Sequence, residues 1–187
     1  MENLKASLGS LGLNDADIVS ICSMFRFKEY AKNEYLLREG QMANKIFFIE
    51  KGSVILGDEL EDKFVTRHLA KEKEFVTSLA SFSKETVSRE FLKTLEPSHI
   101  YAMSKKDFDL LLQRYPTINQ FFQQVIFDTL IKCQQRITDL ISLDAKEYYQ
   151  DILQNHPEYI LRMPQYDLAS YMGIEPQSLS RLKKASE

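Results

Sequence analysis

The spacing of hydrophobic and polar residues changes twice along the chain. Residues 2–31 carry apolar side chains at helical intervals, and Asn14 fits the N-cap of a helix. From residue 34 the pattern consists of short β-type runs, punctuated by polar residues and by Gly40, Gly52 and Gly57. Runs of this length and spacing predict an antiparallel sandwich or barrel. The runs are Tyr35–Leu37, Lys45–Glu50, Ser53–Leu56, Phe64–Leu69, Phe75–Val76, Arg89–Leu95 and His99–Met103.

Helical spacing returns at Ser104, which fits an N-cap, and the short helix that follows ends at Pro116. A longer helix, of about residues 117–143, contains neither Gly nor Pro. Its apolar residues recur at steps of three or four, which is typical of a helix that pairs with a partner. We expect it to join two copies of the chain, and the alternative is a helix that packs only inside its own chain. The predicted seam consists of Ile118, Phe122, Val125, Thr129, Cys133, Ile137 and Leu140.

Residues 144–187 are expected to form a second domain, after the barrel and long helix of residues 1–143. Asp144 fits the N-cap of the first helix of this second domain, and His156-Pro157 ends that helix. Residues 159–164 then connect it to the last segment of the chain.

The last segment, Gln165–Lys184, has the pattern of two short helices joined by a tight turn. Gly173 stands where the chain must reverse, a position that commonly requires a positive φ angle. Pro176 suits the first turn of a new helix, which Leu179 and Leu182 then bury on one side. This pattern predicts a helix-turn-helix whose second helix enters the major groove of DNA. The alternative is an ordinary helical hairpin whose polar face is only solvated.

The polar face of this segment carries the side chains that we expect to contact DNA. They are Gln165, Pro176, Gln177, Ser178, Ser180, Arg181, Lys183 and Lys184. Arg181 has the planar fork that matches guanine, and Gln177, one turn earlier, can bind adenine or accept a cytosine amine. The two serines and Gln165 are expected to reach phosphates, and the two lysines to add attraction that does not depend on base sequence.

The net charge of −3 weighs against DNA binding. Even residues 144–187 hold five Lys and Arg against seven Asp and Glu. From Pro176 onward, however, three basic residues are opposed only by Glu187. The position of charge matters more than its total for docking in a groove, so the DNA hypothesis stands with weakened non-specific binding. The acidic balance favours an alternative, a barrel protein that acts through protein contacts alone.

Catalytic and metal-binding patterns are missing from the sequence. His68, His99 and His156 share no motif, the acidic residues are scattered, and there is no Gly-rich phosphate loop. We therefore predict no enzyme activity and no metal site. Cys22 and Cys133 are far apart, the first residues lack a signal-peptide pattern, and no apolar run could span a bilayer. These features together predict a cytoplasmic protein.

A barrel, a long helix and a helix-turn-helix in this order resemble the bacterial regulators related to the cyclic-AMP receptor protein and the fumarate–nitrate regulator, the Crp/Fnr family. The resemblance covers about residues 20–185. It is most specific in the strand pair from Leu36 to Val54 and in the recognition-helix pattern Ser178–Arg181. The fold class that it implies is α+β, an antiparallel cyclic-nucleotide-binding-like barrel (double-stranded β-helix) followed by a long dimerisation helix and a C-terminal helix-turn-helix domain.

Members of this family that bind cyclic nucleotides carry a Gly-Glu pair and, further along, an Arg that holds the cyclic phosphate. Aligned without a gap, Thr77 and Ser78 replace the Gly-Glu pair here, and Ser88 stands in place of the Arg. Arg89 is adjacent, but one residue's shift along a strand turns a side chain to the opposite face. A charged nucleotide would lack its main counter-groups, so we predict that the barrel does not bind cyclic AMP.

Other cofactors of the family are not expected either. The amino-terminal region has only Cys22, too few ligands for an iron–sulfur cluster, and His68 and His99 lie in strand-like runs that do not suggest a haem ligand. An uncharged or unknown effector remains open. The partners that the resemblance implies are a second copy of the chain, double-stranded DNA with a near-palindromic site, and RNA polymerase.

Overall fold

The computed structural model describes residues 1–60 and 63–186. Its strands form two four-stranded antiparallel sheets, ordered β1-β8-β3-β6 and β2-β7-β4-β5. The strands are β1 Arg26–Tyr30, β2 Tyr35–Leu37, β3 Lys45–Lys51, β4 Val54–Leu60, β5 Lys63–Ala70, β6 Phe75–Val76, β7 Glu90–Thr94 and β8 Ser98–Ser104. Buried side chains of both sheets share one core, which confirms the predicted barrel.

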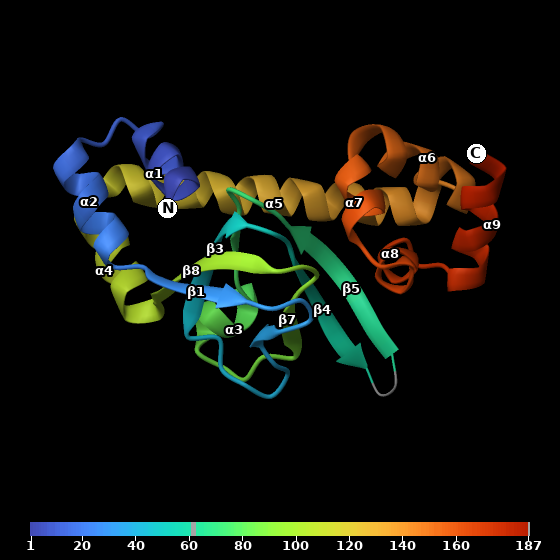
Figure 1. The fold of residues 1–187 in the computed structure, drawn as a ribbon, viewed down its shortest axis with the longest axis horizontal. Helices are drawn as coiled ribbons and strands as arrows, with labels where there is room; N and C mark the ends of the chain where they lie inside the picture. The colour runs from blue at the N-terminus through green and yellow to red at the C-terminus, as the bar shows by residue number, and fades with distance from the viewer. Residues whose placement is uncertain (61–62, 187) are drawn as a thin grey trace.

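Most helices lie toward the two ends of the chain or along one side of the barrel, and only the short α3 lies among the strands (Figure 1). They are α1 Glu2–Gly9, α2 Asp15–Ser23, α3 Leu79–Lys84, α4 Lys105–Arg114, α5 Pro116–Ser142, α6 Ala145–Asn155, α7 Pro157–Arg162, α8 Gln165–Tyr171 and α9 Pro176–Ser186. The long helix α5 passes along the barrel and leads to the C-terminal helices at the opposite end of the molecule from α2 (Figure 1). Among the described residues, no helix combines the length and apolar character needed to cross a membrane.

Local capping interactions begin the helices where the sequence predicts. The side chain of Asn14 accepts the Asp17 N–H (2.9 Å), and that of Ser104 accepts the Asp107 N–H (3.1 Å). Asp144 forms a reciprocal capping box with Glu147 at the start of α6. These bonds satisfy N–H groups that have no partner inside the helix, so they fix the helix starts independently of tertiary packing.

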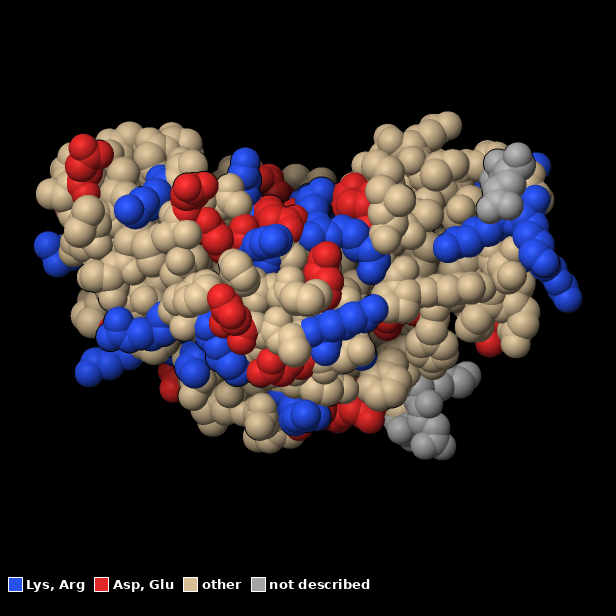
Figure 2. All heavy atoms as spheres, in the orientation of Figure 1, with Lys and Arg blue, Asp and Glu red and all other residues tan. Residues whose placement is uncertain are grey.

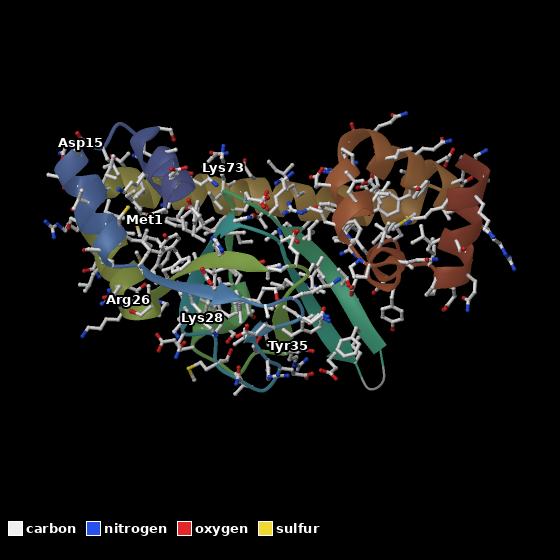
Figure 3. The ribbon with its side chains drawn as sticks, in the orientation of Figure 1. Met1, Asp15, Arg26, Lys28, Tyr35 and Lys73 are labelled. Atoms are coloured by element: carbon white, nitrogen blue, oxygen red, sulfur yellow. The ribbon has the colours of Figure 1, made fainter. Side chains whose placement is uncertain are left out.

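The main core lies between the sheets and under α1, α2, α4 and the first half of α5. Phe75 of β6 contacts the rings of Phe48 and Phe122, with centroids 4.9 Å apart in both pairs. The amino group of Met1, labelled in Figure 3, forms an ion pair with Glu50 of β3 at 2.9 Å. Figure 3 shows side chains filling the space between the barrel and α5.

The second sheet is buried on both of its faces. Val54 and Leu92 point into the barrel core, whereas their neighbours Ile55 and Phe91 belong to a separate cluster with residues of α6, α8 and α9. Successive strand residues point to opposite sides, so the outer face of this sheet supports the C-terminal helices. Helix α5 ends at Ser142 and α6 begins at Ala145, while the division into two domains at residue 144 stays a prediction.

Three local predictions are wrong. The helical pattern of residues 2–31 ends earlier, because residues 26–30 form β1 and pair with β8. Residues 159–164 are not a simple connection, since α7 occupies most of them. Gly57 does not punctuate a turn but lies inside β4, where a Cβ atom would come within 2.6 Å of the Val65 carbonyl oxygen. Gly40 and Gly52, with φ angles of 81° and 98°, do form turns as predicted.

Candidate nucleic-acid interface

Helices α8 and α9 are the two short helices, joined by a tight turn, that the sequence pattern predicts. Gly173 has a φ angle of 69°, and its N–H donates to the Ser170 carbonyl at 3.1 Å, so the left-handed turn after α8 is the one that glycine permits. Leu179 is fully buried between the helices, and Ile174 packs at the edge of the same cluster. The local pattern of Gly, apolar plug and Pro therefore produces the predicted two-helix unit.

The outward face of α9 carries a stripe of three free polar side chains. Gln177, Arg181 and Lys184 are exposed and follow one another at helical spacing. None of them has a hydrogen-bond or ion-pair partner within residues 1–60 and 63–186. Lys and Arg side chains project from the α9 end of the molecule (Figure 2). An unpaired, basic stripe on the second helix of this motif can enter a major groove without breaking any bond of the fold.

The other predicted DNA contacts differ in availability. Pro176, Ser178, Ser180 and Lys183 are half-buried at the sides of α9. Gln165 is exposed at the start of α8, but its side-chain amide donates to the Pro176 carbonyl at 3.0 Å. This bond ties the first turns of the two helices together, so Gln165 also has a structural task that the sequence pattern did not indicate.

The barrel positions that correspond to the nucleotide phosphate site are occupied by a bonded network. Ser78 and Ser88 are buried, and their Oγ atoms lie 2.9 Å apart. Ser78 also donates to the Glu90 carboxylate, which forms an ion pair with Arg67 at 2.9 Å. Ser88 precedes β7, and its hydroxyl bonds to the backbone of Glu90, the first residue of that strand, so a carboxylate lies beside the two hydroxyls that our alignment places at the family's phosphate-binding charges.

The remaining two residues of this predicted pocket lie outside the network. The Arg89 side chain is exposed, whereas the neighbouring Ser88 is buried. The Thr77 hydroxyl donates to the Lys45 carbonyl at 2.9 Å. Glu90 was not identified from the sequence; the available signal was its place two residues after Ser88.

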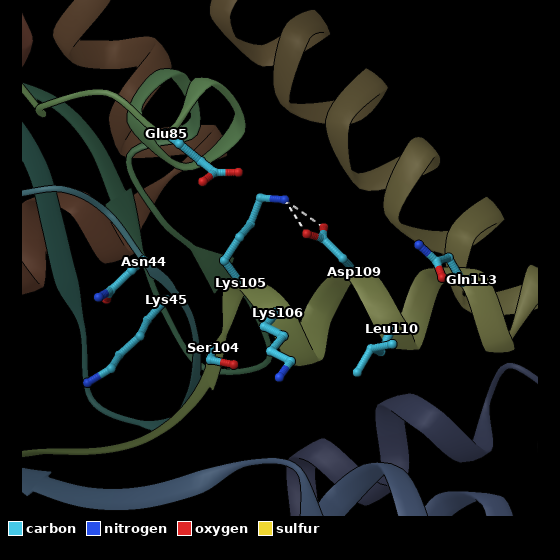
Figure 4. Close-up of a pocket in the computed structure, with 9 residues that line it drawn as sticks. All are labelled: Asn44, Lys45, Glu85, Ser104, Lys105, Lys106, Asp109, Leu110 and Gln113. Atoms are coloured by element: carbon cyan, nitrogen blue, oxygen red, sulfur yellow. Dashed lines mark hydrogen bonds and ion pairs between the residues drawn. The ribbon is translucent and has the colours of Figure 1, made fainter.

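A separate open pocket of about 560 Å³ lies beside α4 (Figure 4). Its lining residues are Asn44, Lys45, Glu85, Ser104, Lys105, Lys106, Asp109, Leu110 and Gln113. The Lys105 ammonium is held by the Asp109 carboxylate at 2.5 and 2.6 Å. This pocket includes none of the four predicted effector-pocket residues.

The predicted seam of α5 has the wrong phase in its first half. Ile118 is fully buried and Phe122 is 7% exposed, and both pack into the core of their own chain. Val125 is half-buried against the barrel side of the helix, and the exposed Thr129 bonds to the Val125 carbonyl at 2.7 Å. A side chain already enclosed by its own chain cannot also form the seam with a second copy.

The second half of α5 exposes a different apolar stripe, which we call the α5 stripe. It consists of Ile126, Leu130, Cys133, Ile137 and Leu140. These residues follow one another at steps of four, three, four and three, the spacing of a coiled-coil seam. Three of them (Cys133, Ile137 and Leu140) belong to the predicted seam. Phe127, Ile131 and Ile141 widen the exposed apolar surface on one side of the stripe.

Polar contacts that the sequence did not predict fix the C-terminal helices on the barrel. The Arg162 guanidinium of α7 donates to Glu72 at 2.7 and 2.8 Å and to Glu96 at 2.9 Å. These bonds from Arg162 lower the pKa of Glu72 to about 2. On α8, burial raises the pKa of Asp167, whose carboxylate accepts the Thr66 hydroxyl at 3.2 Å. Adjacent apolar pairs such as Ile55-Leu56 and Phe91-Leu92 were the available signal, because they indicate a sheet covered on both faces.

The comparisons with known proteins agree with this architecture. Residues 27–115 match the family model described as the cyclic nucleotide-binding domain. The chain is 23% identical over 171 residues to the potassium/sodium hyperpolarization-activated cyclic nucleotide-gated channel 1 of Oryctolagus cuniculus. That alignment covers 88% of this chain but only 18% of the channel, so the chain spans less than a fifth of the length of this relative.

Two bacterial proteins match over more of their own length. The anaerobic regulatory protein of Bacillus subtilis is 24% identical over 187 residues, covering 90% of this chain and 79% of the relative. The solved structure of the global regulator CLP of Xanthomonas campestris superposes with a TM-score of 0.75 at 19% identity, covering 92% of this chain and 91% of that one. Residues 27–115 therefore resemble the cyclic nucleotide-binding domain, and the chain as a whole has the fold of the Crp/Fnr regulators that its sequence resembles.

Proposed function

We propose that this protein is a sequence-specific DNA-binding transcription regulator that acts as a homodimer and does not require cyclic AMP. The observation that carries the proposal is the free stripe of Gln177, Arg181 and Lys184 on the second helix of a well-packed helix-turn-helix. The similarity to regulators such as the anaerobic regulatory protein supports the same function.

The homodimer follows from the α5 stripe. Exposed large apolar side chains are common on proteins singly, but a continuous row of them at seam spacing indicates a covered surface. Leu130 is 52% exposed and Ile137 57% exposed in the single chain. A second copy that pairs in parallel along this row would bring two copies of α9 to the same end of the assembly, as a palindromic DNA site requires.

We expect selection from a random DNA pool to enrich a near-palindrome, and Arg181→Ala to reduce the affinity for it by about 1–3 kcal/mol. Its guanidinium fork can bond the O6 and N7 atoms of guanine, so the preference should relax at one base in each half-site. Lys184→Ala is the matched control on the same helix. Because Lys184 is expected to contact a phosphate, its removal should weaken binding to all DNA sequences alike. It should also lower the slope of log affinity against log salt concentration by about one.

The result that would contradict the proposal is the absence of any enrichment at low salt. Such a result would favour the second function that the acidic net charge of −3 suggests, a barrel protein acting through protein contacts. An enriched site that is insensitive to Arg181→Ala would keep DNA binding but reject our assignment of the guanine contact.

Calorimetric titration with cyclic AMP, cyclic GMP and cyclic di-GMP is expected to show no binding at about 1 mM, a concentration that detects even affinities near −4 kcal/mol. The third nucleotide is included because the CLP regulator is described as responsive to it. We expect no binding of these nucleotides because the Glu90 carboxylate lies beside Ser78 and would repel a phosphate there.

A variant with four changes, Thr77→Gly, Ser78→Glu, Ser88→Arg and Glu90→Ala, serves as the positive control. It restores the residue types of the family's phosphate site and removes the opposing carboxylate. Titration of this variant with cyclic AMP should therefore show a heat of binding. A tight, stoichiometric signal from the unmodified chain would instead mean that Arg67 or backbone amides hold the phosphate, and the prediction would be wrong.

A further inference from the structure

Strand β5 bonds to helix α8 through Phe64 and through Thr66, which is fully buried. The Thr66 N–H donates to the Ser170 hydroxyl of α8 at 3.0 Å, and its own hydroxyl donates to Asp167. The Ser170 hydroxyl donates in turn to the Phe64 carbonyl at 3.0 Å. Because β5 is the edge strand of its sheet, its outer N–H and C=O groups have no neighbouring strand. Helix α8 therefore completes the bonding of this edge in place of a strand.

Arg136 of α5 connects three elements at this point. Its guanidinium donates to the carbonyls of Thr66 and Arg67 on β5, both at 3.3 Å, and to the Tyr171 carbonyl at 2.9 Å. Tyr171 is the last residue of α8, so the cation also lies at the helix end where positive charge is favourable. A planar guanidinium with several fixed N–H directions restrains orientation as well as distance.

A second attachment restrains the same helices from another side. Arg162 of α7 bonds to Glu72, in the turn after β5, and to Glu96, in the turn before β8. Within the C-terminal part, Gln165 and the buried Leu179 hold α9 on α8. The orientation of α8 on the barrel therefore sets the orientation of α9.

We propose that Arg136 is a positioning residue that fixes the angle between the recognition helix α9 and the dimer helix α5, and thereby the distance between the two half-sites that the dimer accepts. This inference rests on the proposed DNA-binding function. The accepted spacing depends on this angle because of the geometry of DNA. One base pair more or less between the half-sites rotates the second half-site about the DNA axis by about a tenth of a turn. If the contact between α5, β5 and α8 is rigid, the dimer accepts one spacing of the half-sites. If this contact is loosened, the dimer also accepts spacings one base pair longer or shorter.

The test measures binding of the full chain to the selected half-site, arranged as inverted repeats with spacers varied one base pair at a time. The wild type should prefer one spacing by about tenfold over its neighbours, a difference of about 1.4 kcal/mol. Arg136→Gln should flatten this preference to within about twofold while its affinity for an isolated half-site stays unchanged. Arg136→Lys, which keeps the charge but loses the fork, should restore the preference in part.

Lys132→Gln is the matched control, since Lys132 lies one turn away on α5 and is 62% exposed. It should retain the wild-type spacing profile. Ser170→Ala removes both bonds that the Ser170 hydroxyl makes to the edge strand without changing α5, so it provides a second test if Arg136→Gln does not fold, and it should flatten the profile likewise. A wild-type profile in both Ser170→Ala and a folded Arg136→Gln would overturn this inference alone. A wild type that binds no DNA would overturn the proposed function and the inference together.

Discussion

The double substitution Leu130→Glu/Ile137→Glu should convert a dimer into monomers and reduce DNA affinity by at least about a hundredfold. Both side chains lie on the α5 stripe and are more than half exposed in the single chain. In a parallel pair they would meet their symmetry mates, so the variant would bury four carboxylates at the seam, each at a cost of several kcal/mol. Sedimentation at micromolar concentration measures the oligomeric state, and titration of the selected palindrome measures the affinity.

Two controls make this result specific to the stripe. Gln124→Glu/Gln135→Glu adds the same charge to the side of α5 opposite the stripe and should leave the dimer intact. Cys133 lies on the stripe and is exposed, whereas Cys22 is buried, so mild oxidation should cross-link the wild-type dimer through Cys133 alone. A wild type that sediments as a monomer, or a dimer that survives Leu130→Glu/Ile137→Glu unchanged, would reject the seam.

The substitution Phe122→Ala should lower the free energy of unfolding by about 3–5 kcal/mol and leave dimerisation unchanged. Phe122 is 7% exposed and contacts the rings of Phe75 and Phe108 at centroid distances of 4.9 and 4.7 Å. Its removal leaves a cavity between the barrel and α5 that the surrounding aromatic rings cannot close. Chemical denaturation in the monomeric double-substitution background measures the loss without a contribution from the dimer.

Phe127→Ala is the matched control, because the same truncation occurs five residues further along the same helix at a side chain that is 60% exposed. It should cost less than about 1 kcal/mol in the monomeric background. The opposite result, in which Phe122→Ala weakens the dimer and spares the monomer, would mean that the seam has the phase first predicted from the sequence.

Features that depend on neighbours in the sequence were predicted well. The caps at Asn14, Ser104 and Asp144 act on N–H groups two or three residues away, so the local pattern is sufficient to locate these helix starts. Gly173 and Pro176 likewise define the turn between α8 and α9 through their own backbone preferences. For the same reason the candidate DNA-binding face, which lies on one short helix, could be located without the structure.

Features that depend on which face of an element is covered were decided by the tertiary structure. An apolar residue on α5 looks the same in the sequence whether it packs on its own barrel, as Ile118 does, or remains exposed, as Ile126 does. The contact of Glu90 with Ser78 and the bonds of Arg136 to β5 and α8 depend on strand pairing and helix docking between distant segments. The sequence by itself thus determined most of the elements, their order and the polar stripe on α9, whereas β1 and α7 became apparent only in the structure. Only tertiary packing decided the phase of the α5 stripe, the filling of the barrel site and the seat of α8 on β5, because each depends on contacts between residues far apart in the chain.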